Sequence, residues 1–192
     1  MGQKYSFLEY IKLFMKKNLT NRRWILANYP DSMPSEENFS LEINLDIPSL
    51  KEGEVLVSAD YLSVDPYVRG RISPTVGYTA GVLPGELLPA GGVGEIIQSQ
   101  SNKFKIGDVV LSSAFGWQEY AVLNEIEVRK IDEKKIPRQA YLSYLGMPGL
   151  TAYFGLVKVG KAKKGETVIV SAASGAVGQV AGQIANSIGC TT

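Results

Sequence analysis

After residue 23, the first part of the chain shows apolar residues alternating with polar ones, the period of two that predicts β-strands with one buried face. Gly, Pro, Asn and Asp separate the alternating runs, as expected for turns. Six runs are predicted to be strands: Trp24–Ala27, Phe39–Leu45, Val55–Tyr61, Val93–Ile97, Val109–Ser112 and Trp117–Val122. Because no helical pattern comes between them, they predict a small antiparallel barrel or sandwich and not βαβ units. The stretch from Gly70 to Gly94 is weakly periodic and rich in Gly and Pro, which is typical of a long functional or mobile loop.

The apolar spacing changes to that of helices after Pro137. A broad apolar band follows, interrupted by a Gly-Met-Pro-Gly sequence at residues 146–149. Pro148 suits the first turn of a second helix, which is predicted to run to about Val159.

A strand and a further helix are predicted at the end of the chain. Gly165 introduces the apolar run Thr-Val-Ile-Val-Ser-Ala at residues 167–172, which indicates a strand buried on both faces. The helix is predicted from about Ala176 to Ile188, with Gly189 as its C-terminal stop.

The junction between this strand and this helix has the pattern of a phosphate-binding turn. Ala173, Gly175 and Gly178 occupy the three small-residue positions of G-x-G-x-x-G, with Ala in place of the first Gly. Gly175 lets the backbone approach a pyrophosphate, and Gly178 lets the helix pack on its strand. The helix N-terminus then offers unpaired N–H groups to the phosphates. We therefore predict a dinucleotide site here, rather than only a tight turn, formed by Ala173, Ser174, Gly175, Ala176, Val177 and Gly178.

The composition is that of a soluble protein, and it excludes several kinds of chemistry. The 192 residues include no His and one Cys, with 20 Lys and Arg against 19 Asp and Glu. The missing His and Cys exclude a disulfide framework and zinc sites built from Cys and His, so no metal is expected. A net charge of +1 argues against nucleic acid as a partner. A single Cys, no cleavable leader and no membrane-spanning run favour a cytoplasmic location.

The N-terminal segment, residues 1–20, is predicted to be a basic extension. Residues 1–23 carry six Lys and Arg against Glu9 alone, and their apolar residues recur at helical spacing. One interpretation is an amphipathic helix that lies on a membrane or on a partner. The first six residues also fit the acylation pattern M-G-x-x-x-[ST]. Because both motifs are short, we prefer an extension that results from a start codon upstream of Met15.

Four blocks of sequence, in order, resemble a known family. They are Asn-Arg-Arg-Trp at 21–24, Tyr-Leu-Ser-Val-Asp-Pro-Tyr-Val-Arg at 61–69, Gly-Met-Pro-Gly-Leu-Thr-Ala-Tyr at 146–153 and Ala-Ala-Ser-Gly-Ala-Val-Gly-Gln at 172–179. The chain resembles the zinc-independent medium-chain dehydrogenase/reductases, in the branch of prostaglandin reductases, plant alkenal double-bond reductases and bacterial curcumin reductase. The resemblance implies a β-rich GroES-like barrel domain over residues 21–138. It also implies linking helices and the first strand–loop–helix unit of an α/β Rossmann domain over residues 139–192.

The resemblance further implies an NADPH-dependent oxidoreductase that reduces the C=C bond of small α,β-unsaturated carbonyl compounds. Hydride addition to the β-carbon builds negative charge on the carbonyl oxygen, which a hydroxyl donor stabilises. By resemblance Tyr67 is this catalytic donor, Tyr67 and Arg69 contact the substrate, and Met147 and Thr151 approach the nicotinamide.

Simpler structural roles stay open for each of these residues. Tyr67 is equally consistent with a packed loop aromatic, and Tyr61, Tyr78 and Tyr153 are chemically eligible as donors. Arg69 and Asp65 can instead form a pair that fixes the loop. Met147 is equally consistent with a core residue and Thr151 with a hydroxyl satisfied within its helix.

The sequence ends at Thr192, where the second strand of a Rossmann sheet is expected to start. The preference for NADP(H) over NAD is therefore implied only by the resemblance, since the residue that reads the ribose lies about 20 positions after the glycines. We expect this chain to be the N-terminal part of such a reductase, either an excised piece or the product of a disrupted reading frame. We expect this part to be inactive alone. An NADPH-dependent quinone oxidoreductase is one alternative. Another is a non-catalytic module that forms homo-oligomers or associates with partners through exposed apolar surface.

Overall fold

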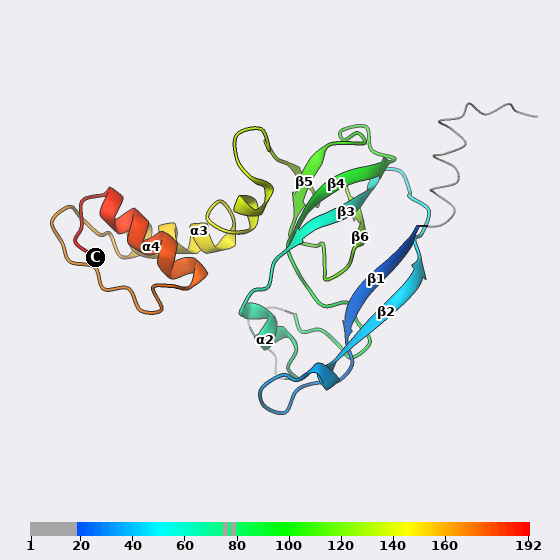
Figure 1. Cartoon of the computed structure of the whole chain (residues 1–192), viewed down its shortest axis with the longest axis horizontal. Coiled ribbons are helices and arrows are strands. Elements are labelled where there is room, and N and C mark those ends of the chain that lie inside the picture. Colours follow the sequence, from blue (N-terminus) through cyan, green and yellow to red (C-terminus); the bar gives the residue numbers. More distant parts are fainter. Residues whose placement is uncertain (1–18, 75–76, 78–79) are drawn as a thin grey trace, which may run out of the picture.

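The computed structural model describes residues 19–74, 77 and 80–192, and Figure 1 shows a strand-rich region on one side and a helical region on the other. The described residues form these strands: β1 (Thr20–Leu26), β2 (Phe39–Asp46), β3 (Glu54–Leu62), β4 (Gly92–Ser99), β5 (Val109–Ser112), β6 (Tyr120–Asn124) and β7 (Arg129–Lys130). Five of them form an antiparallel sheet in the order β6-β3-β4-β5-β7, and β1 and β2 form an antiparallel hairpin. The predicted antiparallel β-domain is confirmed.

The core of the β-domain lies against β3 and β4. Val57 on β3 is opposite Ile96 on β4 and Ala121 on β6, and all three side chains are fully buried. Phe115, in the turn before β6, is also fully buried in this cluster. Burial of such side chains contributes about 1.5–3 kcal/mol each. Three consecutive residues of β3, Val55, Leu56 and Val57, are fully buried and therefore contribute much of the stability of the sheet.

The β1–β2 hairpin is fastened to the segment before β6. The Trp24 N–H donates to the Trp117 carbonyl at 2.8 Å, and Arg23 and Gln118 form an isolated antiparallel bridge. The predicted strand Trp117–Val122 begins only at Tyr120, because its first residues make these contacts to β1 in place of a continuous ladder.

The helices are short and mostly follow the β-domain. They are η1 (Glu36–Asn38), α2 (Tyr67–Arg71), η2 (Arg138–Leu142), α3 (Met147–Tyr153), its π-helical continuation η3 (Phe154–Val159), and α4 (Ala176–Ser187). In Figure 1, α3 and α4 lie together, away from the sheet, and they pack on each other. Pro148 is in the first turn of α3, and Gly189, with φ of +88°, follows the end of α4, as predicted. None of the helices in the described part of the chain is long and apolar enough to cross a membrane.

The prediction that residues 167–172 form a strand buried on both faces is wrong. Thr167 makes a single parallel bridge to Thr191, and the Val168 N–H donates to the Thr191 carbonyl at 2.8 Å. Ile169 is 93% exposed. A parallel strand is buried only where strands flank it and helices cover both faces. Within the described residues, Thr191 alone pairs with this segment.

Two predictions concern residues that the structure does not describe. Of the extension proposed for residues 1–20, only residues 19 and 20 are described. The alternative donor Tyr78 is also outside the described residues.

Candidate functional site

The predicted phosphate-binding residues form an exposed turn that leads into α4. Ala172 has a φ of +49°, and the Gly175 N–H donates to the Ala172 carbonyl at 2.9 Å. Gly175 is the N-cap residue of α4 and has extended backbone angles. The turn therefore reverses the chain within three residues and directs it into the helix.

Gly178 is where α4 approaches this turn most closely. A Cβ atom at Gly178 would lie 2.3 Å from the Ala172 carbonyl oxygen and 2.8 Å from the Ala173 Cα atom. Any larger residue would push the helix away from the segment before it. At Gly182, one turn further along α4, a Cβ atom would meet nothing within 4 Å. This difference agrees with the predicted packing role of Gly178.

The first turn of α4 has backbone N–H groups that lack intrahelical acceptors, as in any α-helix. They belong to Ala176 and Val177, which are exposed, and to Gly178, which is buried against the turn. Ser174 and Gly175 before them are exposed, and the Ser174 carbonyl accepts a hydrogen bond from Gln179 Nε2 at 2.6 Å. Unpaired donors at the positive end of a helix dipole suit a phosphate group. The residues at 173–178 therefore fit the pyrophosphate of a dinucleotide.

Tyr67 is at the start of α2, on the β-domain. It is half-buried, and its ring packs with Trp117 against a cluster made by Leu26, Val68, Ile72, Val82 and Leu88. The ring is thus held by packing while part of the side chain stays accessible. This placement is compatible both with a packed aromatic and with a hydroxyl donor.

Arg69 fixes α2 to a neighbouring loop. Its Nη2 atom donates to the Ser32 carbonyl at 2.7 Å, so Arg69 fixes the loop through this carbonyl and not through Asp65. Ser63, just before α2, accepts a hydrogen bond from the Gly91 N–H at 2.9 Å through its hydroxyl oxygen. The Ser63 carbonyl accepts one from the Trp117 indole at 3.2 Å. The block at 61–69 is therefore tied to the rest of the β-domain at both ends.

Met147 and Thr151 lie one turn apart on α3. Met147 is 48% exposed, so the alternative that it is a core residue is wrong. The Thr151 hydroxyl donates to the Met147 carbonyl at 2.7 Å, as expected for a hydroxyl satisfied within its helix. Tyr153 is 38% exposed, contacts Phe154 edge to face and lies below the Lys158 ammonium group.

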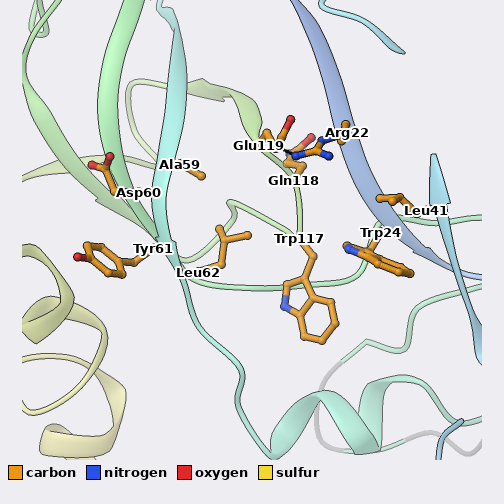
Figure 2. A pocket seen from close by; sticks show the side chains of 10 residues that line it. All are labelled: Arg22, Trp24, Leu41, Ala59, Asp60, Tyr61, Leu62, Trp117, Gln118 and Glu119. Carbon is orange, nitrogen blue, oxygen red and sulfur yellow. Dashed lines mark hydrogen bonds and ion pairs between the residues drawn. The ribbon is translucent and has the colours of Figure 1, made fainter. Parts of the chain in front are cut away.

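A hollow of about 460 Å³ on the β-domain was not predicted from the sequence. Figure 2 shows it between β1 and the end of β3, with the indole rings of Trp24 and Trp117 among its lining side chains and Tyr61 directed away from both. Arg22 and Glu119, at its edge, form an ion pair that holds the pKa of Glu119 below its ordinary value. Tyr67 does not line this hollow. The only sequence signal for it was the Asn-Arg-Arg-Trp block, which says nothing about residues 117–119.

No group of three His, Cys, Asp or Glu side chains that could hold a metal ion occurs in the described ranges. The one Cys, Cys190, is buried, and its thiol donates to the Lys163 carbonyl at 3.2 Å.

Comparison with known proteins gives consistent matches over the same region. Residues 22–131 match a family model described as the N-terminal domain of oxidoreductase. The chain is 41% identical to the NADPH-dependent curcumin reductase of Escherichia coli, over 88% of this chain and 49% of that protein. It is 40% identical to the NADP(+)-dependent 2-alkenal reductase of Nicotiana tabacum, over 92% of this chain and 52% of that protein.

Solved structures agree with this result. The structure of CurA from Vibrio vulnificus in complex with NADPH is 39% identical and superposes with a TM-score of 0.81, over 88% of this chain and 50% of that one. The chain thus spans about half the length of the relatives that it matches.

The antiparallel β-domain followed by a partial Rossmann unit is the arrangement of the matched half of this CurA structure. Because the family model covers more than half of the chain, the protein belongs to the family described as the N-terminal domain of oxidoreductase.

Proposed function

We propose that this chain is the substrate-binding and first cofactor-binding part of an NADPH-dependent reductase of α,β-unsaturated carbonyl compounds. The observation that supports it most is the turn at residues 173–178, where Gly178 is needed sterically and α4 begins with the exposed residues Ala176 and Val177. The relatives at about 40% identity are named as reductases of curcumin and of 2-alkenals, which favours a conjugated carbonyl over a quinone as the substrate.

The residues of the chain have distinct roles in this proposal. The N–H groups of Ala176, Val177 and Gly178 bind the pyrophosphate, and Met147 and Thr151 on α3 approach the nicotinamide. When bound, the cofactor supplies the hydride that adds to the β-carbon. The Tyr67 hydroxyl donates a hydrogen bond to the substrate carbonyl oxygen, where negative charge develops. Arg69, tied to Ser32, holds α2 in place so that Tyr67 keeps its position.

Binding of NADPH to the 192-residue chain, measured by calorimetry, tests the cofactor site. In the Gly175→Asp variant the new carboxylate repels phosphate, while Asp is a favourable N-cap residue that keeps α4 folded. We expect the dissociation constant to rise at least about tenfold, which corresponds to about 1.4 kcal/mol. Gly182→Asp is the matched control, because it adds the same charge on α4 outside the first turn. Equal binding by both variants would contradict the proposal.

The role of Tyr67 is tested separately with cyclohexenone, a conjugated carbonyl ligand, in the presence of NADP⁺. Tyr67→Phe removes the hydroxyl and keeps the packed ring. Loss of one hydrogen bond of about 1 kcal/mol is expected to weaken binding of cyclohexenone about fivefold and to leave cofactor binding unchanged. Unchanged cyclohexenone binding would assign Tyr67 a packing role only.

A further inference from the structure

The linker between the β-domain and the helical region is folded back on the sheet. Ile131 continues from β7 and its N–H donates to the Val109 carbonyl at 3.0 Å. Tyr141 on η2 is buried in the same cluster as Ile131, and its hydroxyl donates to the Asp132 carbonyl at 3.0 Å. The segment 132–141 is therefore a closed loop, with η2 packed on β3 and β4.

One side chain of this loop reaches the sheet directly. Arg138, the first residue of η2, has its Nη1 atom 2.5 Å from an Asp60 carboxylate oxygen on β3 and its Nη2 atom 2.5 Å from a Glu133 oxygen. All three side chains are between 27% and 40% exposed, so the group is partly shielded from water. Burial alone would lower the pKa of Arg138, but the hydrogen bonds to both carboxylates outweigh it and raise that pKa.

The two contacts of Arg138 differ in the sequence separation that they span. Glu133 is five residues away, within the same loop, whereas Asp60 is 78 residues away on a central strand. The bond to Glu133 closes the loop, and the bond to Asp60 fixes the loop on the sheet. A planar guanidinium group can make both bonds at once because its N–H groups point in fixed directions.

Beyond η2, the backbone is closely packed up to the start of α3, so the position of η2 on the sheet affects the position of α3. A Cβ atom at Gly146 would lie 2.4 Å from the Tyr141 carbonyl, and one at Gly149 would lie 1.8 Å from the Tyr144 carbonyl. The Leu145 N–H also donates to the Ala140 carbonyl at 3.0 Å. The backbone is therefore tightly packed between η2 and α3, which favours movement of α3 together with η2.

We propose that Arg138 is a positioning residue that sets the orientation of α3 and α4 relative to the β-domain through Asp60. Residues for the cofactor lie on α3 and α4, and Tyr67 lies on the β-domain, so this orientation determines how the two sets face each other. The inference goes beyond the proposed function, and its test involves no cofactor.

The test is a distance measurement between two spin labels by pulsed electron resonance. Ile126→Cys on the β-domain and Val159→Cys at the end of η3 are suitable label sites, because both side chains are about four-fifths exposed. Cys190→Ser removes the native thiol. The labelled chain is expected to give one narrow distance population.

In this background, Arg138→Ala and Asp60→Asn are each expected to raise the population of other distances about tenfold, which corresponds to about 1.4 kcal/mol. The double variant is expected to do no more than either single one, since both remove the same contact. Glu133→Gln, which affects only the local bond, is expected to have a smaller effect. Arg138→Lys keeps the charge but not the forked geometry and is expected to restore part of the narrow population.

Arg23→Ala is the matched control, because it removes a similarly exposed ion pair, with Glu42, inside the β-domain. It is expected to leave the distances unchanged. A single narrow population in Arg138→Ala would overturn the proposal, and so would equal broadening by Arg23→Ala. If Arg138→Ala does not fold, as judged by tryptophan fluorescence, the nearly isosteric Asp60→Asn gives the same decision.

Discussion

Replacing Asn21 by Ala tests whether the first of the four sequence blocks holds the β-domain together. Asn21 is buried, and its amide nitrogen donates to Gln118 Oε1 and to the Tyr120 carbonyl, both at 2.9 Å. Its amide oxygen accepts from the Tyr120 N–H at 3.0 Å. The side chain therefore joins β1 to β6 by two hydrogen bonds and to the segment before β6 by a third, across about 100 positions in sequence.

The size of the effect follows from these bonds. Each contributes about 0.5–1.5 kcal/mol, and the Tyr120 backbone groups that lose their partner add a desolvation cost, so the free energy of unfolding is expected to fall by about 3 kcal/mol. This is a large part of the roughly 5–15 kcal/mol that stabilises a typical domain. The assay is urea unfolding followed by fluorescence of Trp24 and Trp117, the two Trp residues of the chain, which lie beside this contact.

A matched control separates the contact from the residue type. Asn102→Ala changes an exposed Asn in a turn and is expected to shift the free energy by less than about 0.5 kcal/mol. If Asn21→Ala also shifts it by less than this amount, water replaces the three bonds at no cost, and the reasoning about this block is refuted.

Two further predictions concern α4 and the sheet. Gly178→Ala places a methyl group 2.3 Å from the Ala172 carbonyl oxygen and is expected to lower the thermal midpoint measured by circular dichroism. Gly182→Ala meets nothing and is expected to raise the stability of α4 by about 0.5–1 kcal/mol, and the opposite order would refute the packing argument. Burial alone would raise the pKa of Asp108, but hydrogen bonds from Lys130 and from a backbone N–H hold this pKa below its ordinary value of 3.8. A carboxyl with a lowered folded-state pKa stabilises the fold above its unfolded pKa, and this stabilisation is lost as the pH falls through the folded pKa. Lys130→Met is therefore expected to be less stable than the unsubstituted chain at pH 7, and this difference is expected to shrink as the pH falls through the folded-state pKa of Asp108. A difference that stays constant as the pH is lowered would contradict this cause.

Local patterns predicted those parts of the fold that depend on local interactions. The alternation at Val55 and Val57 predicts a strand with one buried face. The structure forms this strand and buries both residues, but it also buries Leu56 between them and leaves Tyr61 46% exposed. Pro148 and Gly189 mark helix ends through their own backbone preferences, which need no distant partner. The prediction for residues 167–172 failed because an apolar run shows only that a segment can be buried. Whether it is buried depends on neighbouring strands, and within the described residues Thr191 alone pairs with it.

In the candidate site, too, features that depend on local interactions could be predicted, whereas features that depend on tertiary contacts could not. The turn at residues 173–178, for which we propose phosphate binding, could be predicted because its six residues are contiguous and the constraint on Gly178 is steric and local. The contact between Arg138 and Asp60 could not be predicted, because it joins residues 78 positions apart that show no pattern individually. The hollow beside Trp24 and Trp117 forms only when β1 pairs with the segment before β6, so it too depends on tertiary contacts.

Three of the four blocks that resemble the oxidoreductase family hold the backbone in place, and this decides where chemistry can occur. Asn21 joins two strands, Ser63 anchors the segment before α2, and Gly149 allows the close turn into α3. Residues that make such structural contacts support the fold that this chain has in common with its relatives, but they have few free groups for a ligand. The proposed function uses the Tyr67 hydroxyl and the first N–H groups of α4, which take no part in these three contacts. A change that leaves the backbone intact and affects only one of these two places, Tyr67→Phe or Gly175→Asp, therefore separates chemistry from fold more cleanly than a substitution of Asn21, Ser63 or Gly149.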